Sequence, residues 1–100
     1  MRTCSPRVAT LMEREAHEEA GVVGKINRRA LGSFSYAKRL KSGKVIVCEV
    51  KVFGLEVKQQ EKSWPEKGER EVMWLSRTKA AKTVGDRALG AIIRSLPKRQ

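Results

Sequence analysis

The sequence predicts a fold that combines helices and strands, of the α/β or α+β class, and three features of its 100 residues support this prediction. A helical segment with start and stop signals comes first, between Ser5 and Gly21. Residues 31–57 follow; they are rich in β-branched side chains and are interrupted by a turn. Helical segments at 77–84 and 87–95 come last. Strands flanked by helices are typical of a domain in which helices cover a sheet.

The first helix is delimited by residues with known terminal preferences. Ser5 is a good N-cap, and Pro6 suits the first helical position, where no backbone N–H is needed. Helical residues continue to about Ala20, and Gly21 stands where a left-handed C-terminal residue belongs. We therefore expect a helix over residues 6–20.

The central region predicts a β-hairpin. Leu31–Lys38 is the first expected strand. Lys41–Lys44 has the composition of a turn. Val45–Val57 is the second strand, which we expect to be long, with Gly54 as a candidate bulge.

The pattern between the hairpin and the last helices is weaker. Residues 58–70 are polar and contain Trp64-Pro65, which predicts a loop. Glu71–Leu75 predicts a short strand. Each of the two C-terminal helices is preceded by a residue that can cap it, namely Ser76 and Asp86.

Length and composition limit the class of protein. A chain of 100 residues with 40% hydrophobic side chains has room for one domain, at 1–100, and disorder is not expected. No window approaches the ~18 apolar residues of a membrane span, and no basic-then-apolar leader opens the sequence, so we expect no membrane partner. Cys4 and Cys48 match no zinc or redox spacing, which favours a reducing, cytoplasmic compartment.

The charge balance is strongly basic, because 22 Lys plus Arg against 11 Asp plus Glu give a net charge of +11. Such an excess predicts an anionic partner such as nucleic acid or a polyphosphate, although a solvated surface is the plainer explanation. Four of the acids lie within residues 13–19, whereas residues 24–51 hold eight basic residues and one acid. Only five residues are aromatic, and they do not alternate with basic ones, so a stacking platform for single-stranded nucleic acid is poorly supported.

Three carboxylates share one side of the first helix. Glu15, Glu18 and Glu19 stand at i, i+3 and i+4, so they project from one face. Like charges at this spacing repel by roughly 0.2–0.5 kcal/mol per pair, and the C-terminal end of a helix disfavours anions. A bound cation would relieve both costs. Hard divalent ions such as Mg²⁺ take oxygen ligands of this kind and share them with phosphates.

The apolar pattern of the same helix sharpens this interpretation. The stripe that we expect to face a core consists of Val8, Leu11, Met12 and Ala16. Glu15 and Glu19 fall within that stripe, whereas Glu13 and His17 lie on the far side. Carboxylates beside a core indicate a metal site. The alternative is a charged helix with imperfect amphipathicity.

Residues 14–22, REAHEEAGV, resemble the second half of the motif that defines the Nudix hydrolase (MutT-like) family, G-x5-E-x7-R-E-U-x-E-E-x-G-U, where U is a bulky aliphatic residue. Every fixed position of that half matches, and Ala16 is smaller than the usual side chain at its position. Over about residues 8–96 the chain is also similar to the diphosphoinositol-polyphosphate and diadenosine-polyphosphate branch. The features that carry this second similarity are Gly24-Lys25-Ile26, Leu31-Gly32-Ser33-Phe34, the hairpin, Trp64-Pro65-Glu66, Arg70 and Trp74.

The resemblance implies an α-β-α sandwich around a mixed sheet and a hydrolase of phosphoanhydride bonds that uses Mg²⁺ or Mn²⁺. Water would attack one phosphorus while the metal stabilises the attacking and leaving oxygens. By the family's motif, Glu18 and Glu19 would be metal ligands, and Glu15 would be a ligand or the base for the water. Arg14 would hold Glu15 through a charge-assisted hydrogen bond.

The first half of the family's motif is missing. Counting back from Arg14 places the family's first Glu at Pro6 and its Gly before Met1. The strands that normally precede the motif are absent as well. We therefore expect an N-terminally truncated Nudix domain or a shortened relative. Its exposed strand edges would be covered in a homodimer.

Two sets of basic residues are candidates for binding a polyanionic substrate. The first set crowds the expected hairpin and comprises Lys38, Arg39, Lys41 and Lys44. Arg70, just before the expected strand at 71–75, is a second candidate for a phosphate contact. A charged surface is the plainer interpretation of both.

Two functional hypotheses follow. The first is a metal-dependent pyrophosphohydrolase with a small-molecule polyphosphate as its partner: a diphosphoinositol polyphosphate, a dinucleoside polyphosphate or a nucleoside diphosphate linked to another group. The second is a catalytically weakened protein of the same fold that binds nucleic acid or another polyanion. The net charge and the missing half of the motif favour the second, whereas residues 14–22 favour the first, which we prefer.

Overall fold

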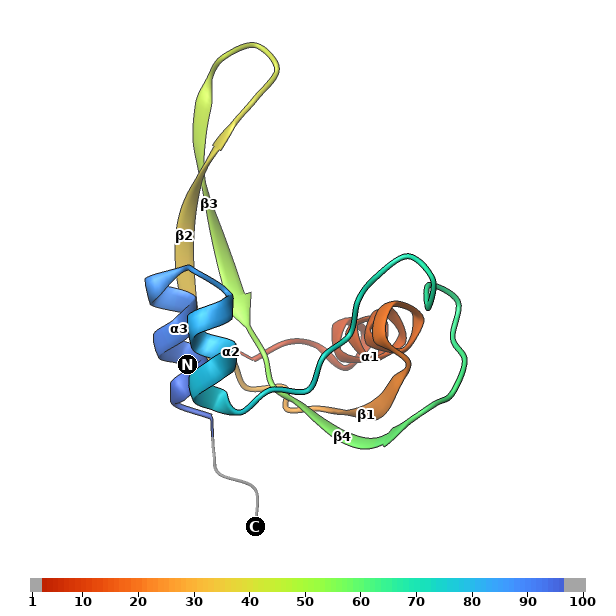
Figure 1. The fold of residues 1–100 in the computed structure, drawn as a ribbon. Coiled ribbons are helices and arrows are strands. Elements are labelled where there is room, and N and C mark those ends of the chain that lie inside the picture. Colours follow the sequence, from red (N-terminus) through yellow and green to blue (C-terminus); the bar gives the residue numbers. More distant parts are fainter. Residues whose placement is uncertain (1–2, 97–100) are drawn as a thin grey trace. The chain divides into compact units, whose positions relative to one another are not determined.

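The computed structural model describes residues 3–96 of the chain (Figure 1). Its elements, in chain order, are α1 (Pro6–Ala20), β1 (Val22–Ile26), β2 (Gly32–Arg39), β3 (Val45–Val52), β4 (Leu55–Gln60), α2 (Arg77–Thr83) and α3 (Arg87–Arg94). Helices and antiparallel strand pairs confirm the predicted α+β class. Both pairings are antiparallel, so the described strands include no parallel pair of the kind that a mixed sheet contains.

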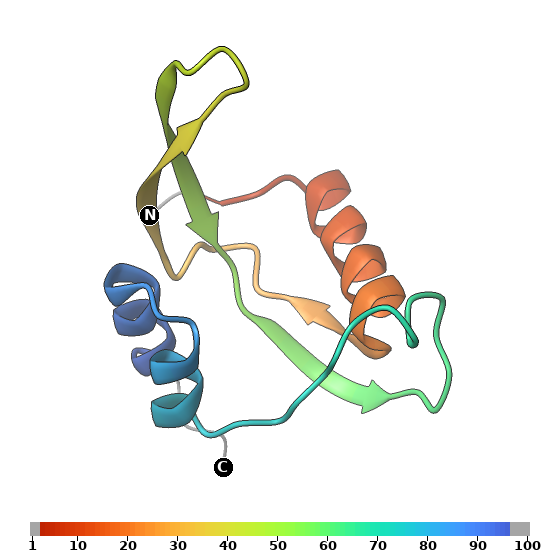
Figure 2. The same cartoon turned by 45° about the horizontal axis from the view of Figure 1, so that its top comes forward.

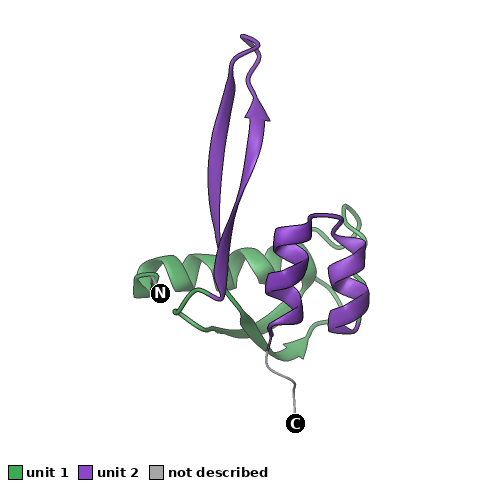
Figure 3. Cartoon of the chain, turned by 90° about the vertical axis from the view of Figure 1, so that its left-hand side faces the viewer, with its two compact units in different colours: residues 1–30, 53–75 green, residues 31–52, 76–100 purple. Residues whose placement is uncertain are grey.

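The chain divides into two compact units, coloured separately in Figure 3. Unit 1 comprises Met1–Ala30 and Phe53–Leu75, and unit 2 comprises Leu31–Val52 and Ser76–Gln100. No helix of residues 3–96 has the length and apolar character needed to cross a membrane. Cys4 and Cys48 are both free thiols.

Unit 1 combines α1 with the β1–β4 pair. β1 runs antiparallel to β4, from Val22 opposite Gln60 to Ile26 opposite Leu55, and α1 packs against β1 (Figure 2). The buried hydrophobic side chains of this unit are small, and they are Cys4, Ala9, Val22 and Ala30.

The ends of α1 form as predicted. The Ser5 hydroxyl accepts the N–H of Val8 at 3.2 Å, and Pro6 occupies the first turn. At the other end Gly21 adopts a left-handed φ of 70° and donates its N–H to the His17 carbonyl at 2.8 Å. Both caps depend only on local sequence, which is why the pattern predicted them.

The buried side of α1 matches the predicted stripe only in part. Met12 and Ala16 are half-buried, but Val8 and Leu11, also predicted to face the core, are 41% and 43% exposed. Ala9 is buried instead, and the half-buried Glu13 accepts the backbone N–H of Ile26 at 2.8 Å. The prediction was wrong for Glu13 because a polar side chain that finds a hydrogen-bond partner on the sheet can face it. The spacing of hydrophobic residues along a helix carries no information about hydrogen-bond partners on other elements.

The predicted long strand at 45–57 is two strands. The chain changes partner at Phe53-Gly54: β3 pairs with β2, whereas β4 pairs with β1, and the Gly54 carbonyl accepts the N–H of Asn27 at 2.8 Å. The register shift that marks a bulge lies at Val23/Gly24 and not at Gly54. The partner of β4 was missed because no strand was predicted at 22–26.

Residues 58–75 also differ from the prediction. Residues 58–60 complete β4, so the loop begins at Glu61. Glu71–Leu75 forms no strand, because within residues 3–96 no backbone ladder includes it. Instead the exposed Trp74 ring donates its Nε1–H to the side chain of Gln60 at 2.8 Å.

Unit 2 combines the predicted hairpin with α2 and α3. β2 pairs with β3 from Gly32 opposite Val52 to Arg39 opposite Val45, and the turn contains Gly43 with a φ of 88°. The helices begin at their predicted caps, Ser76 and Asp86. Within the unit α2 packs on α3 and α3 on the near end of β2, while the far half of the hairpin extends beyond both helices (Figure 1).

Candidate active site

The C-terminal end of α1 is enclosed by the loop at residues 61–70, which runs past it after β4 (Figure 1). The N–H of Glu61 donates to the carbonyl of Gly21 at 2.8 Å, and the N–H of Glu66 donates to the carbonyl of Glu18 at 3.0 Å. The Gln60 amide donates to the carbonyl of Ala20 at 3.3 Å. These bonds satisfy carbonyls that a helix end leaves without partners, and they fix the loop against the helix.

Trp64 packs on the residue that ends α1. A Cβ at Gly21 would lie 2.8 Å from Cζ3 of the Trp64 ring and closer still to two other ring atoms. Gly21 therefore meets two requirements, a left-handed backbone and room for the ring. Lys67 lies over the Trp64 ring, with its Nζ 5.3 Å from the ring centroid, which is a cation–π distance.

His17 is tied to the same loop. We predicted it on the outward face of the helix, but it is half-buried and forms a short contact from Nε2 to a carboxylate oxygen of Glu61. The prediction failed for the same reason as for Glu13: a polar partner on an adjacent element makes this face favourable for a polar side chain.

The three predicted ligands lie on the exposed side of the last turns of α1. The side chains of Glu18 and Glu19 are 44% and 45% exposed. Glu18 lies 4.0 Å from Nε of Arg14, and Glu19 lies 3.3 Å from Nη2 of Arg70. Glu15 is exposed and makes no ion pair or hydrogen bond with the described part of the chain. Arg14 therefore meets Glu18, where the family's motif implied Glu15.

Arg70 bridges two carboxylates. Its Nε donates to Glu66 at 3.0 Å, while Nη2 faces Glu19. The hydrogen bond to Glu66 and then the negative charge of Glu19 raise the pKa of the Arg70 guanidinium above its ordinary value. Arg70 is thus a permanent cation, 55% exposed, at the carboxylate face.

The donor set suits a hard divalent ion, although it is not assembled as a cage. Across residues 3–96 no three His, Cys, Asp or Glu side chains stand close enough together to hold a metal. Mg²⁺, however, is often held by one or two carboxylates together with water and substrate phosphates. Exposed carboxylates at Glu15, Glu18 and Glu19 fit that mode of binding.

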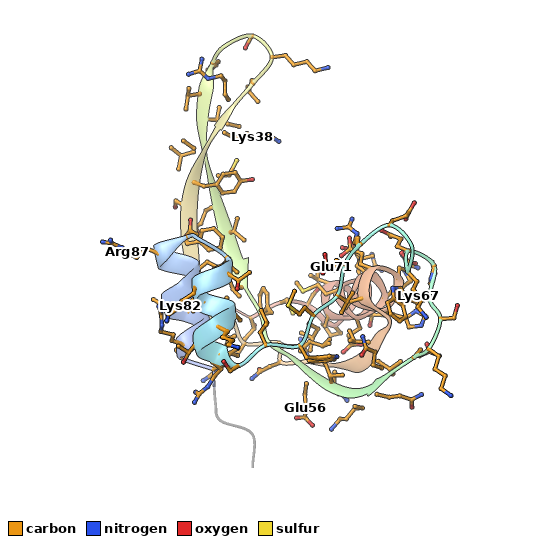
Figure 4. All side chains as sticks on the ribbon, viewed as in Figure 1. Lys38, Glu56, Lys67, Glu71, Lys82 and Arg87 are labelled. Atoms are coloured by element: carbon orange, nitrogen blue, oxygen red, sulfur yellow. The ribbon has the colours of Figure 1, made fainter. Side chains whose placement is uncertain are left out.

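The other predicted substrate contacts lie on the hairpin of unit 2. Its far half carries a cluster of exposed basic side chains, one of which, Lys38, is labelled in Figure 4. Lys38 stands opposite Ile46 and Arg39 opposite Val45, so these neighbours project from opposite faces of the hairpin. The remaining members of the cluster, at or beside the turn, are Lys41 and Lys44.

Several contacts at the site were missed from the sequence, and two of them show what signal was available. One is the packing of Trp64 on Gly21, for which the sequence carries no local signal. The other is the role of Glu66 as a partner of Arg70. Their spacing of four residues was a usable signal, although it is normally applied to helices and these residues lie in a loop.

Comparison with known proteins gives one informative similarity. The chain is 40% identical, over an alignment of 70 residues, to Nudix hydrolase 13, mitochondrial, of Arabidopsis thaliana. The alignment covers 63% of this chain and 34% of the relative, so the chain spans about a third of that protein's length. No family model matches, and no solved structure matches significantly. The similarity supports the Nudix family, in agreement with the resemblance of residues 14–22.

Proposed function

We propose that this chain has the chemistry of a Nudix hydrolase and cleaves a phosphoanhydride bond with the help of a divalent cation. The observation that carries the proposal is the sequence REAHEEAGV on α1, whose carboxylates are exposed to solvent at a helix end fixed by the loop at 61–70. The similarity to a plant Nudix hydrolase supports it independently of the geometry.

The residues of α1 take defined roles under this proposal. Glu18 and Glu19 supply carboxylate oxygens to the cation, and Glu15 is either a further ligand or the base that accepts a proton from the attacking water. When bound, Mg²⁺ or Mn²⁺ polarises the phosphoryl oxygen and stabilises the leaving oxygen. Arg14 lies beside Glu18 and positions that carboxylate.

For the substrate we propose a small polyphosphate, with diphosphoinositol polyphosphates, dinucleoside polyphosphates and nucleoside diphosphates linked to another group as the classes to test. The support is the net charge of +11 and the exposed cations of unit 2 at Lys38, Arg39 and Lys44. Arg70 is the corresponding cation of unit 1.

The proposal is tested by hydrolysis of a panel that contains a diphosphoinositol polyphosphate, a diadenosine polyphosphate and a nucleoside diphosphate linked to another group, with and without Mg²⁺. We expect metal-dependent cleavage of the phosphoanhydride bond in at least one of them, measured from its two phosphorylated products. Glu18→Gln and Glu19→Gln should each lower the rate at least about 100-fold, because each removes a charged ligand of the cation.

Glu71→Gln is the matched control, since Glu71, labelled in Figure 4, is an exposed carboxylate in the same unit and forms no hydrogen bond or ion pair with α1. It should leave the rate within about twofold. Turnover that persists in both ligand variants, or that needs no metal, would contradict the proposal.

A second candidate function is binding of nucleic acid or another polyanion without catalysis. The specific observation in its favour is that the far half of the hairpin displays four exposed cations, Lys38, Arg39, Lys41 and Lys44. Binding of this kind would release counterions and weaken steeply with salt.

The test measures binding of a single-stranded RNA oligonucleotide in EDTA at several salt concentrations. Replacing Lys38, Arg39 and Lys44 by Gln should reduce the slope of log K against log salt by about 2 if those cations contact phosphates. The matched control replaces Lys79, Lys82 and Arg87, three exposed cations of α2 and α3; Lys82 and Arg87 are labelled in Figure 4. Equal slopes in the two triple variants would exclude the hairpin as the binding surface.

For compartment and assembly we propose the cytoplasm and a homodimer. Both cysteines are free, as expected in a reducing compartment, and each two-stranded sheet leaves outer strand edges unpaired within residues 3–96. The plant relative, by its name, is mitochondrial. Cell fractionation and sedimentation measure the two properties directly.

A further inference from the structure

Arg70 forms an ion pair with Glu19, a carboxylate that the proposed function assigns to the metal. Nη2 of Arg70 lies 3.3 Å from Glu19, which is one of the three predicted ligands. The guanidinium is permanently charged. Glu19 therefore has a cationic partner before any metal binds.

The two contacts of Arg70 differ in strength. Toward Glu66 it forms a hydrogen bond of 3.0 Å, and Glu66 itself is fixed to α1 by its backbone N–H. The Glu66 side chain is 30% exposed. Toward Glu19 the contact is a longer ion pair between side chains that are 55% and 45% exposed, so solvent and salt screen it. The contact with Glu19 is the one that a competing ion breaks first.

We propose that Arg70 is a built-in competitor of the divalent cation: the guanidinium and the metal bind the Glu19 carboxylate alternately. This inference rests on the proposed function, because it assumes that Glu19 is a metal ligand. Once the cation displaces it, Arg70 stays attached to Glu66, and its Nη2 group is free for a phosphate oxygen of the substrate. Arg70 would thereby couple occupancy of the metal site to recognition of the phosphate.

A purely structural role makes the opposite prediction. If Arg70 only fastens the loop at 61–70 to α1, its removal loosens the helix end and weakens metal binding. If it competes with the metal, its removal strengthens metal binding. The sign of the change in metal affinity therefore separates the two roles without any measurement of activity.

The experiment titrates Mn²⁺ into the full 100-residue chain by calorimetry and follows free Mn²⁺ by its electron paramagnetic resonance signal. Arg70→Gln should bind Mn²⁺ about two- to fivefold more tightly than the unmodified chain, the range expected for loss of an exposed ion pair. Arg70→Lys keeps the charge but loses the forked geometry, so its affinity should lie between the two.

Two controls isolate the contact with Glu19. Arg7→Gln removes one positive charge from the start of α1, where the exposed Arg7 side chain forms no hydrogen bond or ion pair with any residue of 3–96, and it should leave the affinity within the error of the measurement. In a Glu19→Gln background the Arg70→Gln substitution should no longer tighten Mn²⁺ binding, because the shared carboxylate is absent.

The outcomes separate this inference from the function on which it rests. Unchanged or weaker Mn²⁺ binding by Arg70→Gln, with metal-dependent hydrolysis intact in the unmodified chain, overturns the competition and leaves the function standing. No saturable Mn²⁺ binding by either protein overturns the competition, and a lack of metal-dependent hydrolysis by the unmodified chain overturns the function as well. Tighter binding together with a raised KM for substrate at saturating Mn²⁺ is the result that we expect.

Discussion

The end of α1 and the far half of the β2–β3 hairpin are both rich in charge, but they hold their side chains in different ways. Around α1 the loop at 61–70 contributes backbone hydrogen bonds, the Trp64 ring and the pairing of His17 with Glu61. On the hairpin the backbone hydrogen bonds between β2 and β3 are regular. The side chains of its far half are not covered, however, and even the hydrophobic Val47 is 75% exposed. The end of α1 is thus fixed by tertiary contacts, whereas the basic residues lie on a hairpin whose far half has no comparable packing.

This difference bears on what each region can do. Chemistry on a bound phosphate needs groups held in a fixed geometry, which favours the end of α1. Attraction of a polyanion needs only accessible charge, which the hairpin provides. Substitutions that move the backbone should therefore be costly at α1 and mild on the hairpin.

The largest contrast is expected for glycine to alanine in the two regions. Gly21→Ala adds a Cβ that collides with Trp64 in a left-handed residue with φ 70°, and we expect a loss of about 2–5 kcal/mol in the free energy of unfolding. Gly43→Ala in the hairpin turn meets a similar φ, 88°, but nothing lies within 4 Å of its Cβ. It should cost about 1–2 kcal/mol.

Urea denaturation of both variants measures the contrast, because the linear extrapolation yields each free energy directly. Trp64→Leu in the Gly21→Ala background serves as the control for the collision, since a smaller and more flexible side chain should recover part of the loss. Equal costs at the two glycines would mean that the loop at 61–70 yields easily and does not fix the end of α1.

Local signals predicted much of this molecule. The caps at Ser5, Gly21, Ser76 and Asp86 and the hairpin turn all formed where the sequence indicated, because each depends on a few neighbouring residues. The acidic face of α1 likewise follows from helical spacing alone.

Non-local contacts account for what the sequence did not predict. β1 exists because it pairs with β4, and Gly24 permits this pairing by letting the backbone at Glu56 approach closely. The face that α1 presents to β1 was mispredicted because Glu13 finds the N–H of Ile26. Whether Glu15, Glu18 and Glu19 bind a metal stays a prediction from the resemblance. The structure adds the side chains that already pair with two of these carboxylates, namely Arg14 with Glu18 and Arg70 with Glu19.

The smallest contrast compares valine to threonine in a strand of each region. Val22, the first residue of β1, is 8% exposed, so the new hydroxyl would be buried. We expect Val22→Thr to cost about 1–2 kcal/mol. Val47→Thr places the same hydroxyl in water on the hairpin and should change the free energy of unfolding by less than about 0.5 kcal/mol.

The pair is well matched, because valine and threonine have nearly the same shape and both favour strands. The remaining difference is burial of one hydroxyl, which urea denaturation of the two variants resolves. A cost above 1 kcal/mol for Val47→Thr would mean that the exposed face of the hairpin is covered in solution, for example by a second copy of the chain. Repeating the measurement at several protein concentrations then distinguishes the cases, because the stability of an oligomer rises with concentration and that of a bare hairpin does not.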